Sequence, residues 1–137
     1  VSDPGNLGTL IRSSLGFGID TIILSNDSVD IYNEKVMRST QGAIFNVNIV
    51  YADLPAVIKK LKEQKVTIVG TSLQSSVDLK EISNLSKYAI VLGNEANGIR
   101  KDILELTDVN VKIRISKQLE SLNVAVAGSI VMYYLNN

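Results

Sequence analysis

Three short polar segments interrupt an otherwise apolar chain, and each holds residue types that could bind or orient a ligand. They are Asp3-Pro4-Gly5-Asn6-Leu7-Gly8 with Arg12, Leu92-Gly93-Asn94-Glu95-Ala96-Asn97-Gly98, and Ser121-Leu122-Asn123. Glycine lets a backbone approach a ligand closely, and the Asn, Glu, Ser and Arg side chains supply hydrogen bonds. Because each segment lies at the edge of a predicted strand or helix, we expect the three to converge on one site.

The amino-acid composition excludes several kinds of chemistry. The 137 residues include no Cys and no His, which rules out disulfides, a Cys nucleophile, a His base and the usual zinc ligand sets. Fourteen basic residues balance fourteen acidic ones, so that net charge alone gives no long-range attraction for nucleic acid. The sequence contains neither an apolar stretch of about 20 residues nor a signal-peptide pattern. It therefore predicts one soluble, intracellular domain.

Short β-branched runs alternate with helical patterns along the chain. The predicted strands are residues 21–24, 46–50, 66–70, 88–92 and 109–113. Helices are predicted to begin after Asp3 and end at Gly16 or Gly18, to begin at an Asp53 N-cap, and to span 122–135, with one further helical turn inside the polar segment 74–86. This alternation predicts an α/β fold with a mainly parallel sheet flanked by helices, and a ligand site at the carboxyl ends of the strands.

The polar segments do not match the common nucleotide-binding fingerprints, because Gly16-Phe17-Gly18 is followed by Thr21 instead of a third Gly, and no Gly-Lys-Ser/Thr loop occurs. Together with Arg38-Ser39-Thr40-Gln41-Gly42-Ala43 and the continuation of the last segment to Ala127, they resemble the SpoU/TrmH family of SPOUT RNA 2′-O-methyltransferases. The resemblance covers nearly the whole chain, in order and in spacing. It implies a C-terminal deep trefoil knot, S-adenosyl-L-methionine as cofactor, and methyl transfer to a ribose 2′-hydroxyl of RNA.

The resemblance also implies roles for individual residues, and no metal ion is expected. The catalytic residues would be Asn6, Arg12, Glu95, Ser121 and Asn123. The cofactor would be held, largely through backbone groups, by Thr71, Leu73, Leu92, Gly93, Asn94, Ile113, Ile115, Ser121, Leu122 and Ala127. The residues expected to contact RNA are Arg12, Arg38, Arg114 and Lys117.

The resemblance assigns Arg12 to the activation of the ribose hydroxyl. A guanidinium has a pKa above about 12, so keeping it neutral near pH 7 would cost at least about 7 kcal/mol. An RNA phosphate bound beside Arg12 could instead organise the proton transfer when the substrate arrives. Our hypothesis is that Arg12 positions phosphate and hydroxyl, with literal proton abstraction left open.

Structural roles compete with these functional ones. Asn6 could cap a helix, and Ser121 could cap the last helix with Asn123 in its first turn. Glu95 could be the N-cap or first-turn acid of a helix around residues 100–106. Arg38 could brace a loop. Gly42 and Gly98 are expected to allow a particular backbone conformation and not to contact the ligand.

The last predicted helix is apolar on nearly every side. This pattern is typical of a helix that lies either inside its own domain or at a subunit interface. We favour a homodimer through this C-terminal helix, the usual arrangement in the family. Two positions depart from the family pattern, which has Pro and Gly where this chain has Arg114 and Lys117. These changes could weaken cofactor binding, or they could add positive charge for RNA phosphates.

The sequence thus predicts that residues 1–137 form the catalytic domain of a cytoplasmic ribosomal RNA ribose methyltransferase, with an RNA-binding domain expected before residue 1. The alternatives are a transfer RNA ribose methyltransferase, and a cofactor-binding or RNA-binding module that no longer catalyses. No membrane partner is expected.

Overall fold

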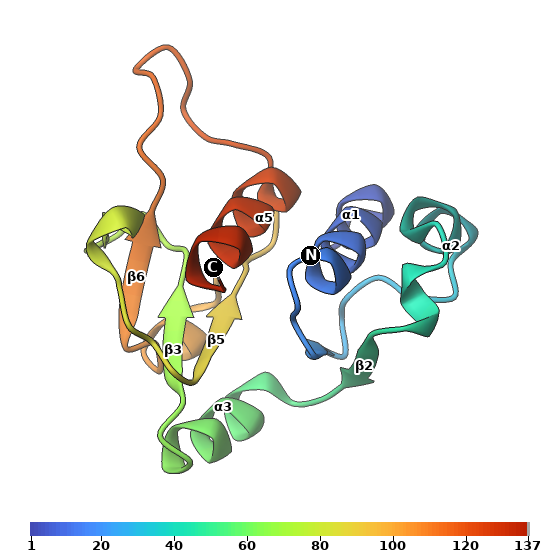
Figure 1. The fold of residues 1–137 in the computed structure, drawn as a ribbon, viewed down its shortest axis with the longest axis horizontal. Coiled ribbons are helices and arrows are strands. Elements are labelled where there is room, and N and C mark those ends of the chain that lie inside the picture. Colours follow the sequence, from blue (N-terminus) through green and yellow to red (C-terminus); the bar gives the residue numbers. More distant parts are fainter. Residues whose placement is uncertain (137) are drawn as a thin grey trace.

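A computed structural model describes residues 1–136 and shows strands flanked by helices (Figure 1). The helices are α1 (Pro4–Gly16), α2 (Glu34–Thr40), α3 (Leu54–Glu63), α4 (Lys101–Leu104) and α5 (Val124–Leu135), with short 3-10 helices at Ala43–Phe45 and Leu79–Glu81. The strands are β1 (Thr21–Leu24), β2 (Asn48–Tyr51), β3 (Thr67–Gly70), β4 (Val77–Asp78), β5 (Tyr88–Val91) and β6 (Val109–Lys112).

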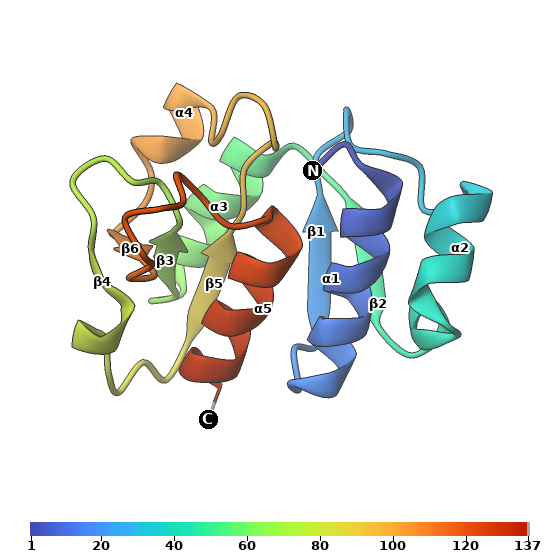
Figure 2. The same cartoon turned by 90° about the horizontal axis from the view of Figure 1, so that it is seen from above.

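All strand pairs are parallel, as the sequence predicts, but they form two sheets instead of one. The smaller sheet pairs β1 with β2, and the larger has the order β4-β6-β3-β5. The edge strands β1 and β5 run in the same direction (Figure 2) and line a cavity of about 550 Å³ between the sheets. The carboxyl ends of these two strands therefore lie on the same side of the molecule, where the polar segments meet.

Helices α1 and α5 lie side by side across the two sheets (Figures 1 and 2). The Ser13 and Ser129 hydroxyl oxygens are 2.7 Å apart, and Gly128 makes the close contact possible because a Cβ there would lie 2.8 Å from side-chain atoms of both Leu10 and Leu92. This packing fixes the position of the amino end of α1 relative to the segment that follows β5.

The other face of the larger sheet is covered by α3 and α4. Ile58 from α3 and Ile103 from α4 form a core cluster with Ile68 of β3, which is fully buried. Burial on both faces explains why β3 reads as a continuous apolar run in the sequence.

A second close helix contact joins α1 to α2. A Cβ at Gly8 would lie 2.5 Å from the Ser39 Cβ and 3.2 Å from the Ser39 carbonyl carbon. Carbon atoms normally pack at about 3.5–4.0 Å, so any residue larger than glycine would force the helices apart. Gly8 therefore sets the distance between α1 and α2.

Several predicted boundaries need correction. The strand expected at 46–50 spans Asn48–Tyr51, and the last helix begins at Val124 because Asn123, and not Ser121, is its N-cap. Asp53 occupies the N-cap position of α3, but its side chain accepts no capping hydrogen bond.

Candidate functional site

Glu95 connects the segment after β5 to the start of α1. Its carboxylate accepts hydrogen bonds from the backbone N–H of Asp3 at 2.8 Å and of Ser2 at 3.2 and 3.3 Å, and from the Ser2 hydroxyl at 3.3 Å. Asp3 in turn caps α1, because its side chain accepts from the Asn6 N–H at 2.9 Å. The cap of α1 is therefore Asp3, and the structural alternative in which Asn6 caps the helix is wrong.

The hydrogen bonds to Glu95 affect its ionisation. Partial burial is the largest single influence and raises the pKa of the carboxyl, but the contributions that lower it, led by the hydrogen bonds from the Asp3 and Ser2 N–H groups and from its own backbone N–H, outweigh burial in sum. The pKa of Glu95 therefore lies below its ordinary value, and the side chain is an anion at neutral pH. It is not at a helix start, because α4 begins at Lys101 with Arg100 as N-cap.

Asn123 joins the third segment to the first. Its side-chain oxygen accepts from the N–H groups of Ala125 at 2.8 Å and Val126 at 3.2 Å, which caps α5. Capping leaves the amide nitrogen free to donate to the Asn6 side-chain oxygen at 3.0 Å. The first and third polar segments, 117 residues apart in sequence, thus meet through two of the predicted catalytic side chains.

The segment after β5 is a tight hairpin. The backbones of Asn94 and Gly98 exchange hydrogen bonds of 2.9 and 2.8 Å, and Gly98 has a φ of 70°, where glycine is favoured. A Cβ at Gly93 would lie 2.7 Å from the Gly98 oxygen and from the Ile99 nitrogen. Gly93 is therefore required by the hairpin itself, before any ligand is considered.

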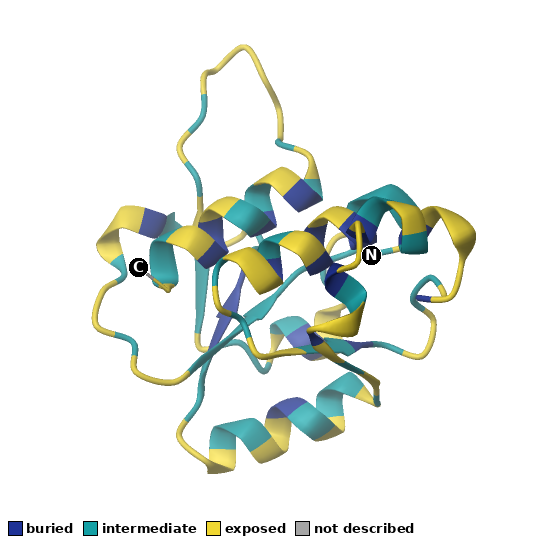
Figure 3. Cartoon of the chain, turned by 45° about the vertical axis from the view of Figure 1, so that its right-hand side comes forward, coloured by how far each residue is buried: buried dark blue, intermediate teal, exposed yellow. Residues whose placement is uncertain are grey.

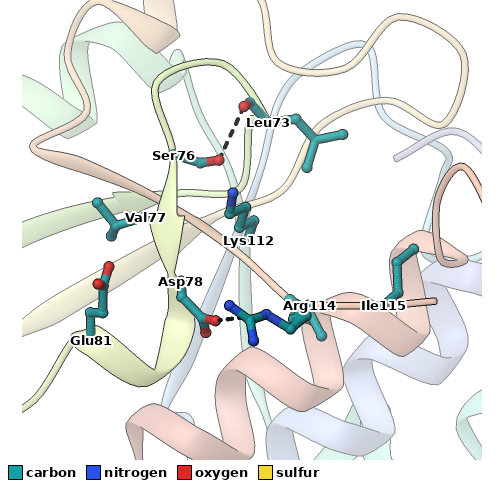
Figure 4. Close-up of a pocket in the computed structure, with 9 residues that line it drawn as sticks. Leu73, Ser76, Val77, Asp78, Glu81, Lys112, Arg114 and Ile115 are labelled. Atoms are coloured by element: carbon teal, nitrogen blue, oxygen red, sulfur yellow. Dashed lines mark hydrogen bonds and ion pairs between the residues drawn. The ribbon is translucent and has the colours of Figure 1, made fainter. Parts of the chain in front are cut away.

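Three of the predicted cofactor residues line a cavity of about 510 Å³ at the carboxyl ends of β4 and β6 (Figure 4). These are Leu73, Ile113 and Ile115, which share the cavity with the carboxylates of Asp78 and Glu81. The other predicted cofactor residues do not line it, namely Thr71, Leu92, Gly93, Asn94, Ser121, Leu122 and Ala127. Thr71 donates its hydroxyl to the Val91 oxygen at 3.0 Å, and so ties the end of β3 to the end of β5.

The two departures from the family pattern lie near this cavity. The Arg114 guanidinium is 3.8 Å from the Asp78 carboxylate, and its side chain is 89% exposed, so that the ion pair is weak. Lys117 lies in an exposed turn, and its φ is not positive. Replacing glycine by lysine at position 117 therefore causes no backbone strain.

The predicted RNA contacts do not belong to the Glu95–Asp3 and Asn6–Asn123 cluster. Arg12 is exposed on α1, six residues beyond Asn6, which is about 9 Å along a helix. Arg38 is exposed in the last turn of α2. Within residues 1–136, neither guanidinium forms an ion pair. Ser121 is exposed in the segment that precedes α5.

Two polar residues of this region were missed by the sequence interpretation. Ser2 contributes a hydroxyl that donates to Glu95 and accepts from the Asn94 side-chain amide at 3.4 Å, and Asp78 contributes a carboxylate to the cavity. Neither lies in a recognised motif, so that no sequence signal identified them.

The described residues 1–136 contain no cluster of His, Cys, Asp and Glu suited to a metal ion. None of the helices in that part of the chain has the length and apolar character of a membrane span.

The fold and site define a parallel α/β domain whose three polar segments meet beyond the carboxyl ends of its strands. Residues 1–133 match the SpoU rRNA Methylase family, and the chain belongs to this family.

Named relatives agree with this assignment. The chain is 41% identical over 135 residues to the Bacillus subtilis 23S rRNA (guanosine(2553)-2′-O)-methyltransferase RlmP, covering 98% of this chain and 54% of the relative. It is 31% identical over 134 residues to the Xylella fastidiosa 23S rRNA (guanosine-2′-O-)-methyltransferase RlmB, covering 97% and 54%. The chain therefore spans about half the length of these curated relatives.

Solved structures give the same picture. The AdoMet-bound rRNA methyltransferase from Sinorhizobium meliloti superposes with a TM-score of 0.91 at 31% identity, covering 97% of this chain and 51% of that one. The SpoU methyltransferase AviRb from Streptomyces viridochromogenes, also in complex with AdoMet, superposes with a TM-score of 0.88 at 25% identity, covering 97% and 55%.

Proposed function

We propose that this chain is the catalytic domain of an S-adenosylmethionine-dependent methyltransferase that modifies a ribose 2′-hydroxyl of ribosomal RNA. The observation that carries the proposal is the meeting of the three polar segments through the Glu95–Asp3 and Asn6–Asn123 hydrogen bonds. Membership of the SpoU family and the names of the relatives support it.

The residues around the 510 Å³ cavity suit the proposed cofactor. This volume is in the range of small-molecule sites, and the apolar side chains of Leu73, Ile113 and Ile115 can cover an adenine ring. The cavity is also lined by two carboxylates, Asp78 and Glu81, and by two basic side chains, Lys112 and Arg114, so both the carboxylate and the ammonium group of the cofactor have charged groups of opposite sign available to them. Gly93 and Leu122, which do not line this cavity, remain proposed backbone contacts of the cofactor. When bound, S-adenosylmethionine supplies an electrophilic methyl group, which the ribose oxygen takes as the carbon–sulfur bond breaks.

The proposed catalytic residues orient the ribose and handle its proton. Asn6, Asn123 and Ser121 hold the sugar so that its hydroxyl faces the methyl group, and effective alignment of this kind accelerates transfer strongly. The Glu95 carboxylate keeps the start of α1 in place through Ser2 and Asp3. The Arg12 guanidinium binds the RNA phosphate and stabilises the oxygen as its proton leaves.

The distance between Arg12 and this cluster supports a site that is completed by a second subunit. The exposed apolar side chains of α5 form a surface suited to such a subunit, namely Val126 (48% exposed), Ile130 (39%) and Tyr133 (56%). Yellow segments in Figure 3 mark the exposed residues along α5 and the neighbouring α1. We therefore propose a homodimer through α5.

Analytical ultracentrifugation tests the dimer. The wild type is expected to sediment as a dimer at micromolar concentration, and Ile130→Lys as a monomer, because a charge would be buried in the interface. A wild type that stays monomeric contradicts the proposed interface.

Three further elements complete the proposal. An RNA-binding domain precedes residue 1, and the protein acts in the cytoplasm, where it meets ribosomal RNA. The C-terminal segment is threaded as a deep trefoil knot, which is supported by the insertion of β6 between the earlier strands β4 and β3. A crystal structure in which residues 113–136 can be drawn out without passing through a loop of the chain would refute the knot.

Methyl transfer from radiolabelled S-adenosylmethionine tests the activity. The full polypeptide is incubated with in vitro transcripts of ribosomal RNA and of transfer RNAs, and the labelled nucleotide is mapped. We expect label in ribosomal RNA, a loss of at least 100-fold in single-turnover rate for Arg12→Ala, and no rescue by Arg12→Lys, because a point charge does not replace the planar guanidinium. Label in transfer RNA alone would establish the alternative substrate. Cofactor binding without transfer to any RNA would indicate a module that no longer catalyses.

A further inference from the structure

Lys35 lies beside the candidate site, although neither its sequence context nor the comparisons assign it a role. It is one helical turn before Ser39 on α2, so the two side chains share one face of the helix. Across from them, Gly5 and Gly8 share one face of α1. Ser39 packs against Gly8, and the Lys35 Cε lies 3.8 Å from the position that a Gly5 Cβ would take.

The contact between Gly8 and Ser39 therefore brings the lysine to α1. Because Gly8 has no side chain, α2 approaches α1 closely, and the aliphatic stem of Lys35 lies along the first turn of α1, at van der Waals distance from the Gly5 Cβ position. Gly5 directly precedes Asn6, whose side chain receives the hydrogen bond from Asn123. The Lys35 stem thus ends next to the point where the polar segments meet.

The charge of Lys35 is not neutralised at this position. Within residues 1–136, the lysine forms no ion pair, although the Asp3 carboxylate also lies beside the Gly5 Cβ position. The Asp3 carboxylate accepts from the Asn6 N–H, and the Glu95 carboxylate is occupied by the Ser2 and Asp3 N–H groups. Lys35 is also exposed, so an incoming anion can reach its ammonium group.

We propose that Lys35 is a positioning residue that binds a phosphate adjoining the reacting ribose. This inference rests on the proposed function, because a ribose held at Asn6 and Asn123 carries a phosphate on either side. The contact would fix the register of the RNA strand, so that one particular 2′-hydroxyl faces the methyl donor. A lysine suits this task as a point charge that does not dictate one hydrogen-bonding plane.

Lys35→Met tests the charge alone, since methionine keeps an unbranched stem over Gly5. Lys59→Met is the matched control, because Lys59 is an exposed lysine that forms no ion pair within residues 1–136. It belongs to α3, which covers the face of the larger sheet opposite to α5 (Figure 1). Both variants are made in the full polypeptide, and their thermal unfolding confirms that they fold.

RNA affinity is measured at 50–200 mM salt with a short, unmodified single-stranded RNA that contains the nucleotide that the enzyme methylates. One lost phosphate contact lowers the slope of log affinity against log salt by about 0.7, which corresponds to about a 5-fold loss of affinity near 100 mM salt. For Lys35→Met we expect this change, a KM for RNA raised about 5- to 10-fold, unchanged affinity for S-adenosylmethionine, and recovery with Lys35→Arg. Lys59→Met should match the wild type.

Failure of the inference about Lys35 can be distinguished from failure of the proposed function. If the wild type methylates RNA while Lys35→Met keeps both the wild-type salt slope and the wild-type KM, the inference about Lys35 is overturned and the proposed function stands. If the wild type neither binds S-adenosylmethionine nor transfers a methyl group, the proposed function falls, and the inference falls with it.

Discussion

Gly8 is expected to be one of the least replaceable residues of the chain, because it sets the distance between α1 and α2. In Gly8→Ala, the new Cβ would lie 2.5 Å from the Ser39 Cβ, about 1 Å closer than carbon atoms normally pack. Overpacking of this kind costs about 1–3 kcal/mol. For a domain of this size, each kcal/mol lowers Tm by roughly 3 °C, so we expect a fall of about 3–9 °C.

Circular dichroism during heating measures this change, and two controls isolate its cause. Gly16 is also in α1, but a Cβ there meets no atom within 4 Å, so Gly16→Ala should leave Tm unchanged or raise it slightly. Adding Ser39→Gly to Gly8→Ala removes the clashing side chain and should restore part of the lost stability, judged against Ser39→Gly alone. Adding Ser39→Ala should restore less, because it removes the Ser39 hydroxyl, which also lies against the new Cβ, but leaves the Ser39 Cβ at 2.5 Å.

The reasoning is refuted if Gly8→Ala is as stable as the wild type, or if Ser39→Ala restores stability as well as Ser39→Gly does. The first result would mean that α2 can move away at no cost. The second would mean that the hydroxyl, and not the approach of the two helices, causes the strain. Displacement of α2 should also weaken RNA binding in Gly8→Ala, since Lys35 and Arg38 move with it.

Two other substitutions test the hydrogen bonds that join the polar segments. Asn123→Asp keeps the oxygen that caps α5 but removes the amide donor to Asn6. We therefore expect this variant to unfold in urea at nearly the wild-type concentration and to lose methyl transfer by at least 10-fold. Asn123→Ala removes the cap as well and should also lose about 1 kcal/mol of stability. The pKa of Glu95 is lowered in the folded protein, so its ionised form stabilises the fold above the ordinary Glu pKa, and this contribution is lost as the pH falls through the lowered value. Urea unfolding between pH 3 and 6 should show this acid-dependent loss in the wild type and not in Glu95→Gln, and identical pH profiles would contradict the assignment.

The elements that could be predicted from the sequence are those with a strong pattern of burial. Ile68 and Val69 in β3 are fully buried, and an apolar run of this kind has few interpretations other than a covered parallel strand. Helix α1 was predicted from Asp3 and Pro4, whose types are favoured at the first positions of a helix, and the structure confirms both.

Short elements could not be predicted, because they carry too few residues to establish a period. Helix α2 has seven residues and β4 has two, and both owe their conformation to the elements they contact. The close approach of α2 to Gly8 is a property of two distant segments, and so the position of Lys35 beside the site was not visible in the sequence. The separation of the strands into two sheets depends on the spacing of β1 and β5, which no local pattern records.

The same limit applies to the competition between structural and functional roles at the polar segments. Asn123 caps α5 with its oxygen and reaches Asn6 with its nitrogen, so that one side chain does both. Asp3 caps α1 with its carboxylate while its own N–H donates to Glu95. The sequence leaves the structural and the site role of Asn123 as alternatives, but here the cap orients the atom that the site uses. Substitutions that keep one atom and change the other, as Asn123→Asp does, are therefore the ones that can separate folding from catalysis.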